Sequence, residues 1–183
     1  MHGRRVALSV LLSIFLLGSF ASPAAASVTR TDYSAFNFPA GWPGTGTSCP
    51  GTWISTPIVS CVVGGGSIER VDGGRWVIRD LETMTYVFAT SDPSLSGYML
   101  STLSANLDAS GSGAARATWS DYSFAGELRT IGTTVGKFQA QRLDGHTVGH
   151  GVGAYAGIHL RADFLPYDTT MGNVIGELMS TPN

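Results

Sequence analysis

The chain of 183 residues carries 11 basic and 13 acidic side chains, a formal net charge of −2, and charged residues make up only 13% of it. The basic residues are scattered, so the sequence lacks the concentrated positive surface that nucleic acids and anionic membranes require, which argues against both as partners. With so few charges, the polar surface must be built mainly from Ser, Thr, Asn and Gly, as is common in exported β-proteins.

The first segment, residues 1–26, is typical of a cleavable secretory signal peptide. Two arginines precede an apolar run from Val6 to Phe20, and Ala24 and Ala26 match the small-residue pattern that signal peptidase accepts. A membrane-spanning helix needs roughly 20 apolar residues, and this run is shorter. We therefore expect cleavage after Ala26, secretion, and no stable membrane anchoring after cleavage.

The next segment, residues 27–52, is rich in Pro, Gly, Ser and aromatic residues and shows no helical period, which predicts an irregular arm. Cys49 lies in this arm and Cys61 follows it. In an oxidising compartment, a cysteine pair at this loop-like spacing predicts a disulfide, which contributes on the order of 3 kcal/mol in the chain-entropy model. A metal site would need further ligands nearby, and none lies close in sequence.

From residue 53 to residue 183 the sequence alternates between strand-like segments and turns, without a convincing amphipathic helix. The apolar parity slips between Leu100 and Leu103, which predicts a β-bulge near residues 101–102. Turn signals lie at Asp72-Gly73, 91–94, 108–113 and Asp144-Gly145. The expected strands cover residues 68–71, 75–90, 97–107, 115–119, 126–131, 135–143, 146–152, 158–164 and 174–179.

This rhythm predicts an all-β domain over residues 53–183: a single closed antiparallel β-barrel of about eight strands, with a β-sandwich as the alternative. Many glycines fall inside strand-like segments, which favours a strongly bent sheet and hence the barrel. A barrel of about eight strands has room either for packed side chains or for one small ligand.

A short glycine-rich stretch carries a resemblance to a known group of proteins. Gly151, Gly153, Tyr155 and Gly157 fill the positions of a G-x-G-x-[aromatic or Leu]-x-G turn between two late strands. In this the chain resembles bacterial proteins with an allene-oxide-cyclase-like or dirigent-like barrel. The resemblance implies an apolar pocket inside a barrel, and some members of that group guide the cyclisation of a bound intermediate. No catalytic residue of the group aligns on this sequence.

Three histidines of the exported part, His146, His150 and His159, lie close in sequence and suggest a metal site. On a strand, however, His146 and His150 would share one face about 13 Å apart, at roughly 3.3 Å per residue, which is too far to hold one ion. His159 could approach His150 across a hairpin, but two ligands do not make a site. No metal site is predicted.

The expected strand at residues 158–164 alternates polar and apolar side chains, with His159, Arg161 and Asp163 in the polar row. If this row lines a pocket, His159 is a candidate acid or base, oriented by Asp163. If it faces solvent, the row is a polar surface with modest cross-strand pairing. The sequence leaves both orientations open.

The candidate ligand-binding side chains are mainly aromatic, although such residues are more typical of a packed core. No nucleophile elbow, phosphate-binding loop or dinucleotide motif occurs in the sequence, so no cofactor is predicted. The candidates are Tyr86, Tyr98, Trp119, Tyr155 and Arg161.

Three functions are consistent with these features. The leading hypothesis is a secreted barrel that binds a small apolar or amphiphilic molecule in its lumen. The second is a cyclase or isomerase that uses the same pocket, and the third is a structural or surface-interaction protein without a ligand. A titratable group inside a pocket would favour the second hypothesis, and a filled interior would favour the third.

Overall fold

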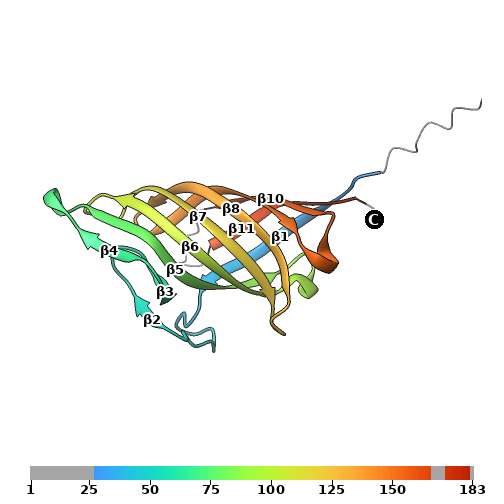
Figure 1. Cartoon of the computed structure of the whole chain (residues 1–183), viewed down its shortest axis with the longest axis horizontal. Helices are drawn as coiled ribbons and strands as arrows, with labels where there is room; N and C mark the ends of the chain where they lie inside the picture. Colours follow the sequence, from blue (N-terminus) through green and yellow to red (C-terminus); the bar gives the residue numbers. More distant parts are fainter. Residues whose placement is uncertain (1–26, 166–171, 182–183) are drawn as a thin grey trace, which may run out of the picture.

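The computed structural model describes residues 27–165 and 172–181, so the signal-peptide interpretation of residues 1–26 lies outside the described residues. In Figure 1 the long strands lie obliquely side by side. The strands are β1 (Thr29–Pro39), β2 (Thr52–Ile54), β3 (Ser60–Gly64), β4 (Ser67–Arg70), β5 (Trp76–Ala89), β6 (Gly97–Leu107), β7 (Gly113–Ser123), β8 (Leu128–Gln139), β9 (Arg142–Gly151), β10 (Ile158–Leu165) and β11 (Gly172–Ser180).

Helical structure in the described part of the chain is limited to three short 3-10 turns. They are η1 (Asp72–Gly74), η2 (Pro93–Leu95) and η3 (Gly153–Tyr155). A search of the described residues finds no helix that is both long and apolar enough to cross a membrane.

Eight strands form a closed hydrogen-bonded ring. They follow the order β1-β11-β10-β9-β8-β7-β6-β5, and β5 pairs back with β1 through residues from Ala35 opposite Ala89 to Pro39 opposite Thr85. The pairings around the ring are antiparallel. Outside the ring, β3 and β4 pair with β5, and β2 pairs with β3. The predicted all-β class is confirmed. Closure of this kind is the connectivity that a barrel requires.

Residues 27–52 correct the expectation of an irregular arm. Their first part is β1, a full member of the ring that pairs with both β11 and β5. Its alternation was hidden because both faces carry large side chains: Tyr33 and Ala35 point into the ring, while Phe36 and Phe38 lie on the outside. Only the part after β1 is irregular, and the predicted disulfide between Cys49 and Cys61 joins it to β3.

The bulge expected in β6 lies instead in β5. In β6 the inward side chains Met99, Ser101 and Leu103 alternate without a slip, because the polar Ser101 occupies a buried position. The irregular register is in β5 between Ile78 and Leu81. There the backbone N–H of Asp80 donates to Ser104 Oγ.

The expected turn at Asp144-Gly145 is also in a different place. Strands β8 and β9 are joined at Ala140 and Gln141, whose φ angles are 47° and 72°. Gly145 lies inside β9 opposite Gly136 of β8, and a Cβ on Gly145 would come within 3.0 Å of the Gly136 Cα. Gly145 therefore allows β8 and β9 to approach closely, and it does not form a turn.

The interior of the ring contains two apolar clusters and the buried indole of Trp119. One cluster includes Ile78, Leu103 and Phe138, and the other includes Tyr33, Phe164 and Val174. Trp119 lies against Gly132 and Gly149, where any Cβ would overlap the indole ring. Its Nε1 donates to Thr147 Oγ1 at 3.0 Å, so the buried indole N–H is satisfied.

Candidate functional site

An interior cavity of about 50 Å³ lies in the part of the ring near η2 and η3. Its lining is mostly apolar and includes Met99 and Leu160, together with a few polar side chains. Ligand pockets usually measure about 300–1,000 Å³, whereas a single water needs roughly 10–15 Å³. The cavity is therefore large enough for a few waters or a very small molecule.

Asn37 of β1 contributes an unsatisfied polar atom to this cavity. The residue is 8% exposed, and its Oδ1 has no hydrogen-bond partner among the described residues. A buried acceptor without a partner costs about 1–3 kcal/mol, so native proteins rarely keep one without a reason. A hydrogen-bond donor supplied by a bound molecule would satisfy it.

Tyr33, four residues before Asn37 on the inward face of β1, also lines the cavity. Burial raises the pKa of its phenol well above the ordinary value of 10.0, and the nearby carboxylate of Asp121 raises this pKa further. The phenol therefore stays protonated and offers the cavity both a donor and an acceptor.

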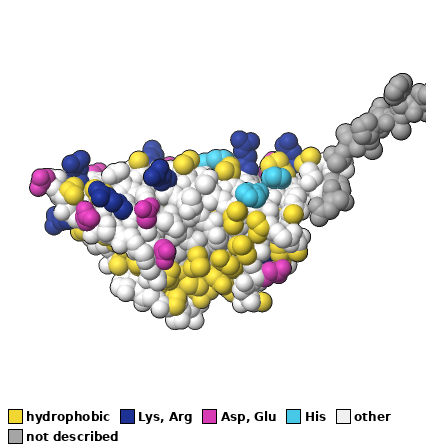
Figure 2. Space-filling view, viewed as in Figure 1, with side chains coloured by type: hydrophobic (Ala, Val, Ile, Leu, Met, Phe, Trp, Pro, Cys, Tyr) yellow, Lys and Arg dark blue, Asp and Glu magenta, His cyan; other side chains and the backbone are white. Residues whose placement is uncertain are grey.

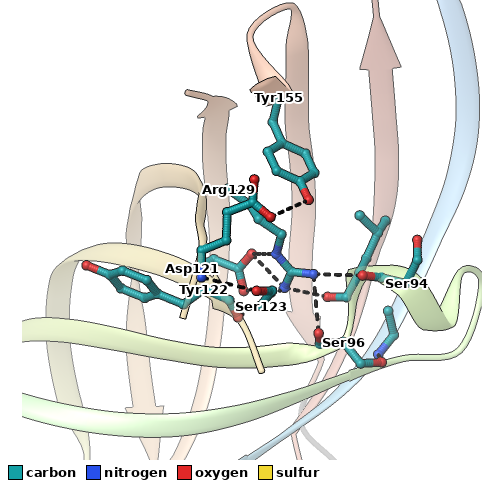
Figure 3. A network of polar contacts seen from close by, with 10 residues as sticks. Ser94, Ser96, Asp121, Tyr122, Ser123, Arg129 and Tyr155 are labelled. Carbon is teal, nitrogen blue, oxygen red and sulfur yellow. Dashed lines mark hydrogen bonds and ion pairs between the residues drawn. The ribbon is translucent and has the colours of Figure 1, made fainter. Parts of the chain in front are cut away.

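Arg129 also lines the cavity, and its side chain is only 1% exposed (Figure 3). Nε donates to Asp121 Oδ2 at 3.0 Å, and the two Nη atoms reach three successive carbonyl oxygens in and beside η2. The acceptors of Arg129 are Asp121 Oδ1 and Oδ2 and the carbonyl oxygens of Ser94, Leu95, Ser96 and Tyr122. One side chain thus holds η2 against β7 and β8.

Asp121 is the titratable carboxyl group of this cavity. Burial raises its pKa to about 6, while the charge of Arg129 and hydrogen bonds from Arg129 and Thr130 act to lower it. The carboxyl is thus poised near neutrality, where acid–base groups work best. Figure 3 also shows Tyr155 of η3, whose hydroxyl donates to Glu127 Oε2 at 3.4 Å.

The polar row of β10 lies outside the ring. Leu160, Ala162 and Phe164 face inward, whereas His159 and Asp163 are exposed. Asp163 Oδ1 lies 2.7 Å from His146 Nδ1, within hydrogen-bond distance, and His159 is opposite His150. The structure therefore does not bring His159 and Asp163 together.

The five predicted ligand-binding side chains divide between the two faces of the sheet. Trp119 and Tyr155 line the interior cavity. Tyr86 and Tyr98 are half-buried on the outer surface, where Tyr98 stacks on Tyr122 with ring centroids 5.2 Å apart, and Arg161 is exposed there. In the described residues, no three His, Cys, Asp or Glu side chains are grouped so that they could hold a metal ion.

Sequence reasoning missed most residues of the cavity lining, among them four with polar groups. Tyr33 and Asn37 were hidden in the supposed arm, although they share the parity of Ala35. Asp121 continues the inward row of Ala117 and Trp119, and this parity was the available signal. The fourth, Arg129, follows no such alternation, because the β7–β8 register shifts near Asp121.

Comparisons with models of protein families, with curated proteins and with solved structures returned no match. The resemblance to allene-oxide-cyclase-like and dirigent-like barrels therefore stays a prediction that rests on the glycine-rich turn alone. The function must be argued from the cavity and the surface of this chain.

Proposed function

We propose that this is a secreted protein that binds a small, mainly apolar molecule inside the eight-stranded ring. The observation that carries the proposal is the buried Asn37 Oδ1, which has no partner among the described residues and lines an apolar cavity. A ligand with one N–H or O–H group would satisfy this acceptor and bury its apolar part against Met99 and Leu160. Few polar groups in an apolar pocket are typical of small-molecule sites.

The volume of the interior cavity limits the size of the ligand that can bind. An engineered cavity of about 150 Å³ binds benzene, so the present 50 Å³ accepts only a smaller molecule while the side chains keep their places. A larger ligand requires Met99 and Leu95 to move. Methionine adapts readily to a new shape, but Leu95 belongs to η2, which Arg129 holds in place.

One observation favours the enzyme alternative, a cyclase or isomerase in the same cavity. Asp121 lines the cavity with a pKa raised to about 6 and is therefore suited to proton transfer near neutrality. Both of its oxygens accept from Arg129, so the same contacts also give it a structural role. Binding that persists in Asp121→Asn while turnover disappears would support the enzyme.

Export is the second part of the proposal. The Cys49–Cys61 disulfide is compatible with an extracellular protein, and residues 1–26 have the pattern of a cleavable signal. N-terminal sequencing of material from the medium should begin at or within a few residues of Ser27. An intact Met1 on exported protein would contradict this part.

The binding site is tested by NMR titration of the ¹⁵N-labelled secreted protein with ethanol and acetamide, which donate hydrogen bonds, and with acetonitrile, which does not. We expect saturable shifts around Asn37 and Met99, at lower concentrations for the two donors than for acetonitrile. Asn37→Leu should abolish this preference, and Asn106→Leu, an exposed position on β6, should leave it intact. Absence of saturable shifts at the cavity would refute the site.

A further inference from the structure

A second hollow lies on the outside of the ring and is much larger than the interior cavity. It measures about 760 Å³, within the size range of ligand sites, and spans the outer faces of β5 to β10. Its floor lies over Gly132 and Gly149, at the place where these glycines let the sheet lie directly on the Trp119 indole. We call it the outer groove.

The outer groove is lined by rows of uncharged side chains that run across the strands. Thr102, Thr118 and Thr133 are direct cross-strand neighbours on β6, β7 and β8. The adjacent row contains Leu100, Ser120 and Ile131 in the same way, and Tyr122 follows Ser120 along β7 on the same face. Hydroxyl groups therefore alternate with apolar surface across the width of the groove.

Four serine and threonine hydroxyls of the outer groove have no hydrogen-bond partner in the part of the chain that the structure describes. Among the described residues, none shares a hydrogen bond with the side-chain hydroxyl of Thr102, Thr118, Ser120 or Thr133. In the turns, by contrast, hydroxyls such as those of Ser94 and Ser110 bond to the carboxylates of their own turns. The groove thus offers several groups that can each donate and accept a hydrogen bond.

The charged side chains in and around the outer groove determine which class of ligand can bind there. The lining contains neither Lys nor Arg, and its ionisable groups are Glu82 at one end and His150 and His159 at the other. Figure 2 shows the Lys and Arg side chains of one face mainly along its upper and left margins, with largely uncharged surface, a few Asp and Glu side chains and some His side chains between them and the hydrophobic area below. Arg161 borders the groove opposite Val148, but the lining itself holds no cation of this kind, so a polyanion would find little counter-charge here. An apolar peptide would leave the hydroxyls without partners.

From these observations we propose that the outer groove binds a neutral oligosaccharide. The ligand's hydroxyls would pair with the threonine row, and the apolar faces of its sugar rings would lie on Leu100, Ile131 and Tyr122. From β6 to β10 the groove covers four inter-strand spacings, roughly 19 Å at about 4.8 Å each, which is long enough for several sugar rings. This site is separate from the interior cavity.

The test is calorimetric titration of the secreted protein with cellohexaose, chitohexaose and maltohexaose, and with a heparin hexasaccharide as the anionic counter-probe. We expect at least one neutral hexasaccharide to bind, and to bind at least tenfold more weakly to the triple variant Thr102→Val/Thr118→Val/Thr133→Val. Thr52→Val, an exposed threonine of β2 outside the groove, is the matched control and should bind as the parent does.

A second pair of variants tests the proposal even if the triple variant does not fold. Thr118→Lys places a long charged side chain in the groove and should abolish binding, whereas Val135→Lys, on the outer face of β8 and 59% exposed, should not. The proposal is overturned if none of the three neutral sugars binds, if heparin binds as well as they do, or if Thr118→Lys binds them unchanged. It is also overturned if the parent self-associates through this face and Thr118→Lys prevents it.

Discussion

The buried Asn37 side chain makes an unfavourable contribution to the stability of the folded protein. Its Oδ1 is buried without a partner among the described residues, in a position where Val87 and other apolar side chains surround the cavity. Residues that bind ligands often cost stability in the free protein, because their polar groups are satisfied only in the complex.

We therefore predict that Asn37→Leu stabilises the ligand-free protein by about 1 kcal/mol, since the substitution removes a buried acceptor and adds apolar contact at similar volume. Urea unfolding followed by far-UV circular dichroism measures the change. A loss of stability of similar size would show that the amide has a structural partner, and the ligand argument would then lose its main support.

The carboxyl of Asp121 gives the protein a specific pH dependence. Its pKa of about 6 in the folded protein exceeds the ordinary 3.8, so the folded chain binds the proton more tightly than the unfolded chain. The contribution of Asp121 to the free energy of unfolding must then increase as the pH falls from about 6 to about 4. In Asp121→Asn this contribution, on the order of 1–3 kcal/mol, should be absent.

The comparison uses urea unfolding of both proteins at several pH values across this window. Hydrogen bonds from Ser94 and Ser110 lower the pKa values of Asp92 and Asp108. These two carboxyl groups make the folded protein less stable as the pH falls, but they do so equally in the parent and in Asp121→Asn. They therefore do not affect the difference between the two pH profiles. Identical pH profiles for the parent and Asp121→Asn would refute the raised pKa.

Among the elements, η3 and its flanking glycines show what a glycine-driven pattern can predict. The sequence predicted a turn that contains Gly153 and Gly157, and both residues adopt a positive φ, at 57° and 92°. A Cβ added to Gly153 would have no atom within 4 Å, so backbone conformation alone demands the glycine there.

We predict that Gly153→Val lowers the free energy of unfolding by about 1–3 kcal/mol, because a β-branched residue is strained at positive φ. Ala154→Val, at the next and equally exposed position of η3, is the control and should change stability little. Thermal unfolding of both variants gives the comparison. Equal stability of Gly153→Val and the parent would contradict the tight-turn argument.

The elements also show where sequence patterns succeed and fail. Strands with one apolar and one polar face, such as β6 and β10, were predicted within a residue or two. β1 was missed because aromatic side chains occupy both of its faces. β8 was divided in two at Gly132, which resembles a break, and Gly136 in the second half did not correct this. Local patterns cannot reveal that these glycines lie opposite an indole or a neighbouring strand.

The candidate site was less predictable than the strands for a similar reason. Trp119 and Tyr155 were found because large aromatics are few, but the parity of β10 could not say which row faces inward. The Arg129 contacts join η2, β7 and β8, and the acceptors in η2 are backbone carbonyls, which carry no sequence signature. Such a contact depends on tertiary structure alone.

At the scale of the whole molecule, the disulfide fixes the irregular segment after β1 to the outside of the ring. Cys49 and Cys61 have Cα atoms 5.6 Å apart, and the described residues contain no free cysteine. We predict that alkylation of the protein without reductant leaves its intact mass unchanged, and that alkylation after reduction adds two alkyl groups. Uptake of two groups without reductant would refute the bond.

The closure of the ring has a consequence for how the chain is made. β1, the first strand, completes its pairing only with β11, the last described one, and Thr29 lies opposite Ser180. No part of the chain that lacks β11 can therefore close the ring on both sides of β1. Folds with such distant pairings form slowly, since loop closure must precede most stabilising contacts. We expect the ring to stay open, with one edge of β1 unpaired, until β11 has been synthesised.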